Sequence, residues 1–249
     1  MSKEITNISA NEPHLSSICT AMLLAIAKQQ QPPTQNMLLA TLLDMYHACQ
    51  QGTIAQSNQL LSFELTEQAM DNAVHSLEQK LLNECPSART LKQSISYLLD
   101  ELTCNIQQHA HADFGIAYIS YNADLQTIDI ALADNGITIY GSFVKADKYL
   151  DLIGESDAEA LGLAQEGYST KDLPNAENRG YGISSNIKMV SEGLQGELVI
   201  ISGGAMSLFT PNSNKLLSLP NGVEWNGTLI VARIPVDIPI IYNFYNYIA

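Results

Sequence analysis

The chain has 249 residues, 46% of them hydrophobic, which is enough to bury a packed core in one large domain or two small ones. Its formal net charge of −14 and its pI near 4.5 argue against nucleic acid and anionic membranes as partners, because both bind basic surfaces. We therefore expect a protein that binds neither.

Cysteine content and the N-terminal sequence indicate the cellular compartment. The four cysteines are scattered without a Cys-x-x-Cys pair, so the sequence indicates neither a zinc site nor a disulfide framework. No basic segment precedes an apolar run near the N-terminus, and the longest apolar run, residues 18–27, is too short to span a bilayer. These features predict a cytoplasmic protein.

Helical periodicity dominates the first 86 residues. Apolar residues recur at helical spacing over residues 15–27, 37–49 and 67–82. Thr34 precedes the second of these helices and is its predicted N-cap. Residues 60–65 fit either a strand or a helix. The segment Cys85-Pro86-Ser87 is the clearest break, so we expect a mostly helical region of unassigned role over residues 1–86.

After this break the sequence predicts one long helix, residues 88–110, and then a change to strand periodicity. Strand patterns follow over residues 114–121, 127–133, 197–202, 205–209 and 227–235. Between them, helices are predicted over residues 157–165 and 181–193, and the remainder of residues 137–180 is rich in loop-forming residues. The fold class is therefore α+β, with a lid-like insertion around residues 137–180.

Three short blocks in this second part carry candidate functional residues. The first is Glu101-Leu-Thr-Cys-Asn105-Ile-Gln-Gln-His109, which lies within the long predicted helix. Its acid, amide and imidazole are spaced at i, i+4 and i+8. On an α-helix these positions share a face, with a drift of about 40° at each step.

The other two blocks are turns that contain glycine. Asp134-Asn-Gly136 places a carboxylate at the end of an apolar run. Asn178-Arg-Gly180-Tyr-Gly182-Ile183 opens directly into a helix, where free backbone N–H groups bind phosphate. Taken singly, each block has an ordinary structural explanation as an exposed helix face, a turn after a strand or a helix start. Their order along the chain is the informative feature.

In this order the blocks resemble the ATP-binding domain shared by DNA gyrase B subunits, heat-shock chaperones of the ninety-kilodalton class, sensor histidine kinases and mismatch-repair ATPases (the GHKL superfamily). The resemblance covers residues 88–235 and is nearest in character to histidine-kinase-like or anti-sigma-factor-like ATPases. It implies that residues 87–249 form a two-layer α/β sandwich of the Bergerat type. In that fold, helices cover one face of a mixed sheet and ATP lies between the helices and the lid.

The resemblance assigns the catalytic and metal-binding roles to the first block. Glu101 matches the acid that orients or deprotonates the attacking water in the hydrolysing members. Asn105 matches the amide whose oxygen binds Mg²⁺, a hard ion that prefers oxygen ligands. His109 lies one turn further along and is expected to reach phosphate or Mg²⁺-bound water.

The adenine-binding roles fall on the second block and on the last predicted strand. Asp134 matches the carboxylate that accepts a hydrogen bond from the adenine amino group. Gly136 lets the backbone pass close to the base without a Cβ atom in the way. Thr228 matches a hydroxyl that lies beside this aspartate and shares a water molecule with adenine.

The phosphate-binding roles fall on the third block and on the lid. Gly180 and Gly182 match the glycine box whose N–H groups hold the phosphates at a helix N-terminus. Lys171 and Arg179 lie in the lid, where a cation neutralises the γ-phosphate.

Two features depart from the family pattern. The family usually has Asp-x-Gly-x-Gly in the second block, whereas here Thr138 stands at the second glycine position. In addition, neither His47 nor His75 lies in the sequence context of a phosphoacceptor histidine, so an autophosphorylating sensor kinase is not expected.

The resemblance implies an ATP- and Mg²⁺-binding regulatory protein of bacterial signalling, which hydrolyses ATP or transfers phosphate to a protein partner. One alternative is a non-catalytic interaction module that ATP gates by closing the lid, with the helical region or the aromatic tail (residues 242–247) engaging the partner. A third interpretation is an interaction domain whose pocket binds no nucleotide. The feature that favours this interpretation is Thr138 at the position of the usual second glycine. Family analogy also implies a homodimer.

Two further segments have simple structural interpretations. The aromatic tail is expected to pack on its own domain. The acidic residues between positions 147 and 159 are expected to form a solvated face of the lid.

Overall fold

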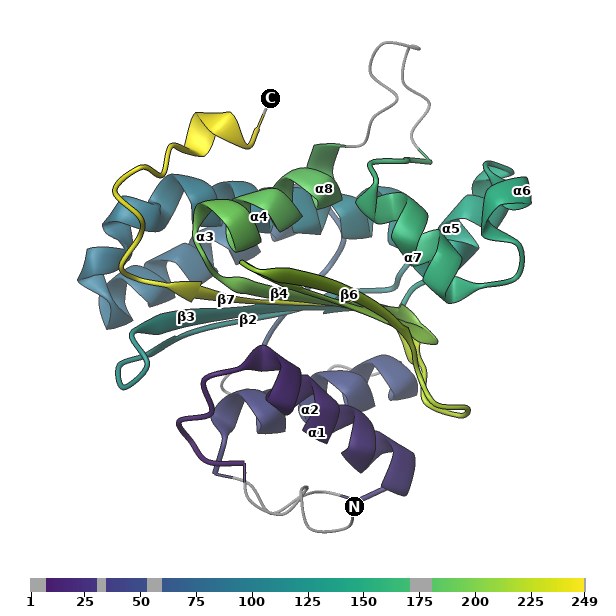
Figure 1. Cartoon of the computed structure of the whole chain (residues 1–249), viewed down its shortest axis with the longest axis horizontal. Helices are drawn as coiled ribbons and strands as arrows, with labels where there is room; N and C mark the ends of the chain where they lie inside the picture. The colour runs from purple at the N-terminus through teal and green to yellow at the C-terminus, as the bar shows by residue number, and fades with distance from the viewer. Residues whose placement is uncertain (1–7, 31–34, 53–59, 171–180, 249) are drawn as a thin grey trace.

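A seven-stranded sheet forms the middle layer of the protein (Figure 1). The structure, a computed structural model, describes residues 8–30, 35–52, 60–170 and 181–248. The strands are β1 (Leu61–Phe63), β2 (Gly115–Asn122), β3 (Thr127–Asp134), β4 (Glu197–Gly203), β5 (Ala205–Thr210), β6 (Ser213–Ser218) and β7 (Trp225–Pro235). They are arranged in the order β1-β2-β3-β7-β4-β5-β6, and every neighbouring pair is antiparallel. The mixed sheet that the resemblance implied is therefore wrong for the described strands.

Helices cover both faces of this sheet. The α-helices are α1 (Leu15–Lys28), α2 (Met37–Gln51), α3 (Glu67–Glu84), α4 (Lys92–Asn105), α5 (Ile139–Ala146), α6 (Leu150–Ile153), α7 (Asp157–Gln165) and α8 (Tyr181–Lys188). In Figure 1, α1 and α2 lie below the sheet, and α3, α4, α7 and α8 lie above it. The α+β class is confirmed, and the helix layer above the sheet is compatible with an α/β sandwich.

The two faces of the sheet belong to separate apolar cores, because successive side chains on a strand point to opposite sides. On β7, Ile230 and Ala232 pack in the core under α3 and α4, whereas Leu229 and Val231 pack in the core over α1 and α2. The segments before residue 86 contribute to both cores. They supply α1 and α2 of the lower layer, α3 of the upper layer and the edge strand β1 of the sheet.

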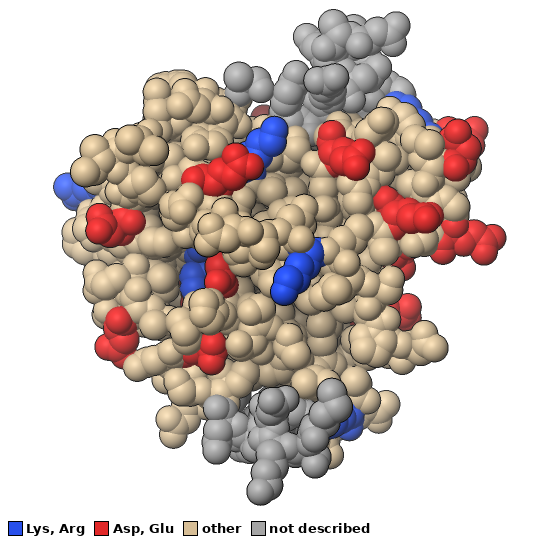
Figure 2. All heavy atoms as spheres, in the orientation of Figure 1, with Lys and Arg blue, Asp and Glu red and all other residues tan. Residues whose placement is uncertain are grey.

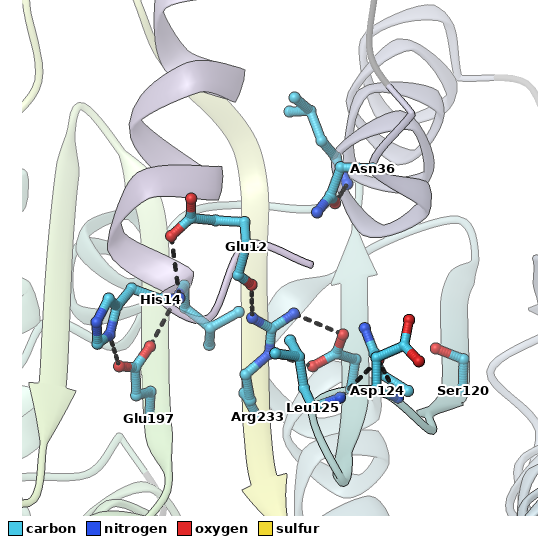
Figure 3. A network of polar contacts seen from close by, with 12 residues as sticks. Glu12, His14, Asn36, Ser120, Asp124, Leu125, Glu197 and Arg233 are labelled. Carbon is cyan, nitrogen blue, oxygen red and sulfur yellow. Dashed lines mark hydrogen bonds and ion pairs between the residues drawn. The ribbon is translucent and has the colours of Figure 1, made fainter. Parts of the chain in front are cut away.

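A buried ion pair in the sheet holds the segment at the start of α1 (Figure 3). Asp129 and Arg233 face each other directly across β3 and β7 and are 3% and 4% exposed. The guanidinium donates to both carboxylate oxygens over 2.6 and 2.8 Å and to the Glu12 carbonyl oxygen over 2.6 Å. Glu197 on β4 accepts from the first N–H group of α1, at Leu15, over 2.6 Å. The start of α1 is thus held by a carboxylate and an arginine from the sheet.

Polar side chains cap the starts of several helices. Asn36 caps α2 by accepting from the Leu39 N–H over 2.9 Å. The prediction that Thr34, which lies outside the described residues, caps this helix is wrong, because α2 begins at Met37 and its N-cap is therefore Asn36. Thr66 caps α3 and Ser156 caps α7 in the same way.

Residues 88–110 are helical, but the prediction of one regular α-helix is wrong. Its first turn is a 3₁₀ helix, η1 (Pro86–Leu91), followed by α4 and then by a π-helical segment, η2 (Ile106–Ala110). A second π-helical segment, η3 (Met189–Gly193), follows α8. Such local widening is common at functional sites and carries no periodic signature in the sequence.

The aromatic tail packs on its own domain, as predicted. Tyr242 and Tyr247 stack with ring centroids 5.7 Å apart, and the Tyr242 hydroxyl is 2.6 Å from the Ser94 hydroxyl on α4. Phe244, in the short 3₁₀ helix η4 (Phe244–Asn246), meets Tyr97 of α4 edge to face at 5.7 Å. The tail therefore lies on the helix that carries the first sequence block.

Within the described ranges, no helix has the length and apolar character needed to cross a lipid bilayer.

Candidate functional site

A pocket with a cavity volume of about 110 Å³ lies between the upper face of the sheet and the helices above it. This volume holds several water molecules or a flat heterocycle. The lining residues come from α4, η2, β3, the α5 region, the end of α7, the segment that follows α7, the start of α8 and β7: Leu102, Asn105, Ile106, His109, Ala110, Leu132, Asp134, Ile137, Thr138, Ile139, Ser142, Phe143, Ala164, Tyr168, Ser169, Thr170, Gly182, Ile183, Thr228 and Ile230.

The pocket brings together side chains from all three sequence blocks. Asn105 and His109 line it from the first block, Asp134 from the second, Gly182 from the third and Thr228 from the last strand. These residues are separated by up to 123 positions in the chain, so the fold and not local sequence makes them neighbours. The predicted lid residues Lys171, Arg179 and Gly180 lie outside the described residues.

Asp134 is a buried carboxylate at the floor of the pocket. It ends β3 and is 2% exposed. Burial raises the pKa of its carboxyl group from 3.8 to about 7, although backbone N–H groups of Gly136 and Thr228 donate hydrogen bonds that act in the opposite direction. The Gly136 N–H lies 2.9 Å from Oδ1. Such a perturbed acid in a cleft is typical of a functional position.

Two glycines allow the backbone to pack around this carboxylate. Gly227 has a φ of +92°, and a Cβ atom there would overlap the backbone and side-chain oxygens of Asp134. Gly136 faces the other way, and a Cβ atom there would overlap the Ala110 carbonyl oxygen at the end of η2. Gly136 is therefore a packing requirement between the second block and η2, and it does not line the pocket itself.

A hydroxyl pair beside Asp134 connects the pocket to the start of α5. The Thr228 hydroxyl is 3.2 Å from the Ser202 hydroxyl, and Ser202 accepts from the Ile139 N–H over 2.9 Å. Sequence reasoning missed Ser202, because a serine in a strand has no distinguishing pattern.

Thr138, which stands at the second glycine position of the pattern that the blocks resemble, is the N-cap of α5. Its hydroxyl accepts from the Gly141 N–H over 3.0 Å. Its φ of −68° and ψ of 171° are ordinary extended values, so no glycine is required at this position. The described part of the predicted lid is consequently helical, with α5, α6 and α7 packed around a small core of their own.

The acidic run of the lid is mostly solvated, as predicted, with one exception. Asp157 accepts a hydrogen bond from the Gly204 N–H over 2.8 Å, and a Cβ atom at Gly203 would overlap its carboxylate. This residue ties the first turn of α7 to the β4–β5 turn.

The start of α8 contacts the acid and the amide of the first block. A Cβ atom at Gly182 would lie 2.6 Å from Glu101 Oε2 and 3.6 Å from Asn105 Nδ2, so only glycine fits between α8 and α4 without displacing a side chain. Glu101 lies behind this contact and does not line the pocket. Among the described residues, Asn105 Nδ2 is buried without a hydrogen-bond partner. A buried orphan amide next to a pocket indicates a polar group that the pocket receives.

His109 lies in the π-helical segment η2, where the i+8 face expected for a regular helix does not apply. It still lines the pocket, and its Nδ1 atom is 2.8 Å from the Thr170 hydroxyl. The Thr170 hydroxyl is also 3.2 Å from the Ser142 hydroxyl, and Lys148 Nζ donates to the Thr170 carbonyl oxygen over 3.2 Å. Sequence reasoning missed Thr170, Ser142 and Lys148, which carry no motif.

The residues that line the pocket offer few ligands for a metal ion. In the described parts of the chain, no group of three or more His, Cys, Asp or Glu side chains forms a metal site. A bound Mg²⁺ would therefore depend on the Asn105 amide oxygen, on phosphate oxygens of a nucleotide and on water, since Mg²⁺ takes oxygen ligands and keeps several waters. The unpartnered Nδ2 of Asn105 is a hydrogen-bond donor and fits a phosphate oxygen, and the buried Asp134 carboxylate fits an amino group such as that of adenine.

The scan of protein-family models found no match to this chain, and the search of curated proteins found no significant match.

Proposed function

We propose that this chain binds ATP with Mg²⁺ and acts as a regulatory protein that hydrolyses ATP or transfers its phosphate to a protein partner. The observation that carries the proposal is the pocket in which a buried carboxylate, Asp134, shares one cavity with the orphan amide of Asn105 and the glycine start of α8. The resemblance of the three blocks supports the same assignment.

The Asp134 end of the pocket suits adenine. A flat heterocycle fits between apolar walls that include Ile137, Ile183 and Ile230. The ionised Asp134 carboxylate accepts a hydrogen bond from the exocyclic amino group of adenine. Because this carboxylate is buried, a ligand without a hydrogen-bond donor at that position would leave it unpaired and would bind less tightly. Thr228 supplies a hydroxyl beside the carboxylate for a water-mediated contact.

The Asn105 end suits the phosphates. The first turn of α8 offers N–H groups that no helical carbonyl satisfies, which bind anions. Bound Mg²⁺ supplies charge neutralisation and polarises the phosphoryl group. Asn105 holds that ion through its amide oxygen, and His109 faces the same end from η2. Glu101, on α4 one turn before Asn105, is the proposed general base for water, although in this structure its carboxylate contacts Gly182 and does not line the pocket.

One observation favours a second candidate, a nucleotide-gated interaction module. Glu101 contacts Gly182 instead of lining the pocket. In a protein that keeps this arrangement, bound ATP changes the position of α5, α7 and α8. A protein partner then binds the ATP-bound conformation, and no ATP is hydrolysed. A homodimer is part of the same proposal and is supported by family analogy alone.

Surface charge supports a small-molecule ligand and a protein partner over nucleic acid or membrane. The net charge of the chain is −14. On the face shown in Figure 2, basic side chains are isolated from one another, and acidic ones are more numerous. This face therefore has no continuous basic surface of the kind that binds nucleic acid or an anionic membrane.

The test is calorimetric titration of ATP and ADP, with and without Mg²⁺, into the wild type, Asp134→Asn and Asp124→Asn. Asp124 is an exposed carboxylate in the β2–β3 turn and provides the matched control. Micromolar binding that is lost only in Asp134→Asn supports the proposal. The absence of heat and of a thermal shift in wild type at millimolar ATP contradicts both candidates. Turnover by wild type but not by Glu101→Ala separates the enzyme from the interaction module.

A further inference from the structure

The phosphate end of the pocket contains an imidazole–hydroxyl pair that the proposed function does not use. We propose that Thr170 is a phosphoryl acceptor, modified in cis by the γ-phosphoryl group of the bound nucleoside triphosphate with His109 as general base. This inference rests on the proposed nucleotide binding and adds a modification site to it.

The two side chains come from distant parts of the chain and meet in the cavity. His109 Nδ1 lies 2.8 Å from the Thr170 hydroxyl, within the range in which a base accepts a proton from a nucleophile. Both residues line the pocket. His109 is also one turn beyond Asn105, so Thr170 faces the end assigned to phosphate and not the Asp134 end.

The surroundings hold Thr170 in one position. Lys148 Nζ donates to its carbonyl oxygen over 3.2 Å, and the Ser142 hydroxyl lies 3.2 Å from its own hydroxyl. With the Thr170 hydroxyl donating to His109 Nδ1, its oxygen accepts from Ser142 and keeps a lone pair for attack. A nucleophile, a base and two groups that orient the nucleophile are therefore present together.

The reaction balances with these groups alone. The Thr170 hydroxyl oxygen forms a bond to the γ-phosphorus, and the bond between that phosphorus and the bridging oxygen of the β-phosphate breaks. The hydroxyl proton passes to His109 Nδ1, and the nucleoside diphosphate leaves with the bonding electron pair. The product carries close to two negative charges beside Lys148 and the protonated His109, which stabilise it.

The geometry also limits the extent of the reaction. Phosphate on Thr170 occupies the part of the pocket that the γ-phosphate of a second nucleotide needs. We therefore expect at most one phosphate per chain and weaker binding of ATP to the modified protein. Because donor and acceptor belong to one chain, the rate is independent of protein concentration.

The experiment incubates the full chain with Mg²⁺ and ATP that carries a radioactive γ-phosphate, and maps the product by mass spectrometry. Acid-stable label at position 170 supports the inference, because phosphothreonine survives acid and phosphohistidine does not. Thr170→Ser retains labelling and Thr170→Val loses it. His109→Gln slows labelling by roughly 10²–10⁴-fold, the usual contribution of a positioned base. Asp124→Asn, which changes an exposed carboxylate outside the pocket, retains the label at position 170.

Calorimetry on the same preparations separates this inference from the proposed function. Wild type that binds ATP but gains no label overturns the inference and leaves nucleotide binding intact. Label on another residue, acid-labile label, or label that persists in Thr170→Val overturns it as well. Failure of wild type to bind ATP contradicts the proposed function and this inference together. Mapping of the wild-type product decides the outcome even where Thr170→Val fails to fold.

Discussion

Replacement of Asp134 by asparagine should stabilise the protein increasingly as the pH rises. Burial raises the pKa of Asp134 from 3.8 to about 7, so the folded state holds this proton more tightly than the unfolded state. Between these two values the unfolded chain releases the proton first, and the free energy of unfolding of the wild type falls with increasing pH. The destabilisation is absent below about pH 4 and complete above about pH 7. Asparagine has the same shape and does not ionise, so it removes this dependence.

The size of the effect follows from the two pKa values. Each pKa unit corresponds to about 1.4 kcal/mol, so the full destabilisation above pH 7 is roughly 4 kcal/mol. Between pH 5 and pH 8 the linkage relation gives an increase of about 2.5 kcal/mol in the stability of Asp134→Asn relative to wild type. The asparagine oxygen still accepts from the Gly136 N–H. Its unpaired N–H₂ group costs about 1–3 kcal/mol, and this cost is the same at both pH values.

Denaturant unfolding of both proteins at pH 5 and pH 8, without nucleotide, measures the difference. Every other titrating group is present in both proteins, so their difference isolates Asp134. Asp124→Asn, which replaces an exposed carboxylate, is the control. A difference between wild type and Asp134→Asn that is constant to within about 0.5 kcal/mol over this range would refute a buried Asp134 with a raised pKa.

The remaining predictions concern the pocket and the buried contacts. ATP affinity of the wild type should fall as the pH decreases below about 7, because protonated Asp134 no longer accepts from adenine; titrations at pH 6 and pH 8 that agree would contradict this. Gly182→Ala should lower ATP turnover with little change in Tm, because the new Cβ would lie 2.6 Å from the mobile carboxylate of Glu101; unchanged turnover would dissociate that contact from catalysis. Arg233→Met should lower the free energy of unfolding by about 3–5 kcal/mol, and a second change, Asp129→Leu, should restore most of it; a loss below about 1 kcal/mol would argue against a desolvated pair. Tyr242→Phe should cost about 1 kcal/mol through loss of one hydrogen bond to α4, measured by denaturant unfolding.

Hydrophobic periodicity predicted the helices and strands in which buried and exposed positions alternate regularly. The apolar period of residues 15–27 gave α1, and the strand pattern of residues 127–133 gave β3, each within one residue. The three blocks also predicted that Asn105, Asp134 and Gly182 would meet, and they do line one pocket. That agreement depends on a resemblance of order along the chain, not on any single spacing.

The sequence could not predict features that depend on tertiary neighbours. Every residue of β6 is exposed, so it has no apolar alternation, and its pairing with β5 alone makes it a strand. The start of α5 depends on a cap by Thr138, in a segment that the sequence characterised only as rich in loop-forming residues. The contact of His109 with Thr170 joins residues 61 positions apart and has no local signal. Which face α1 and α2 cover likewise follows from a core shared with strands far along the chain.

The position of β7 has a consequence for how the chain acquires its structure. It is the last strand of the described chain in sequence, yet it pairs with β3 on one side and β4 on the other, in the middle of the sheet. Without residues 225–235, the other described strands form two separate three-stranded sheets, each with an unpaired edge strand that is prone to aggregation. The arginine that holds the start of α1 belongs to the same strand. Completion of the sheet, docking of the first helix and closure of the Thr228 side of the pocket are therefore one late event in folding, dominated by contacts of long sequence separation.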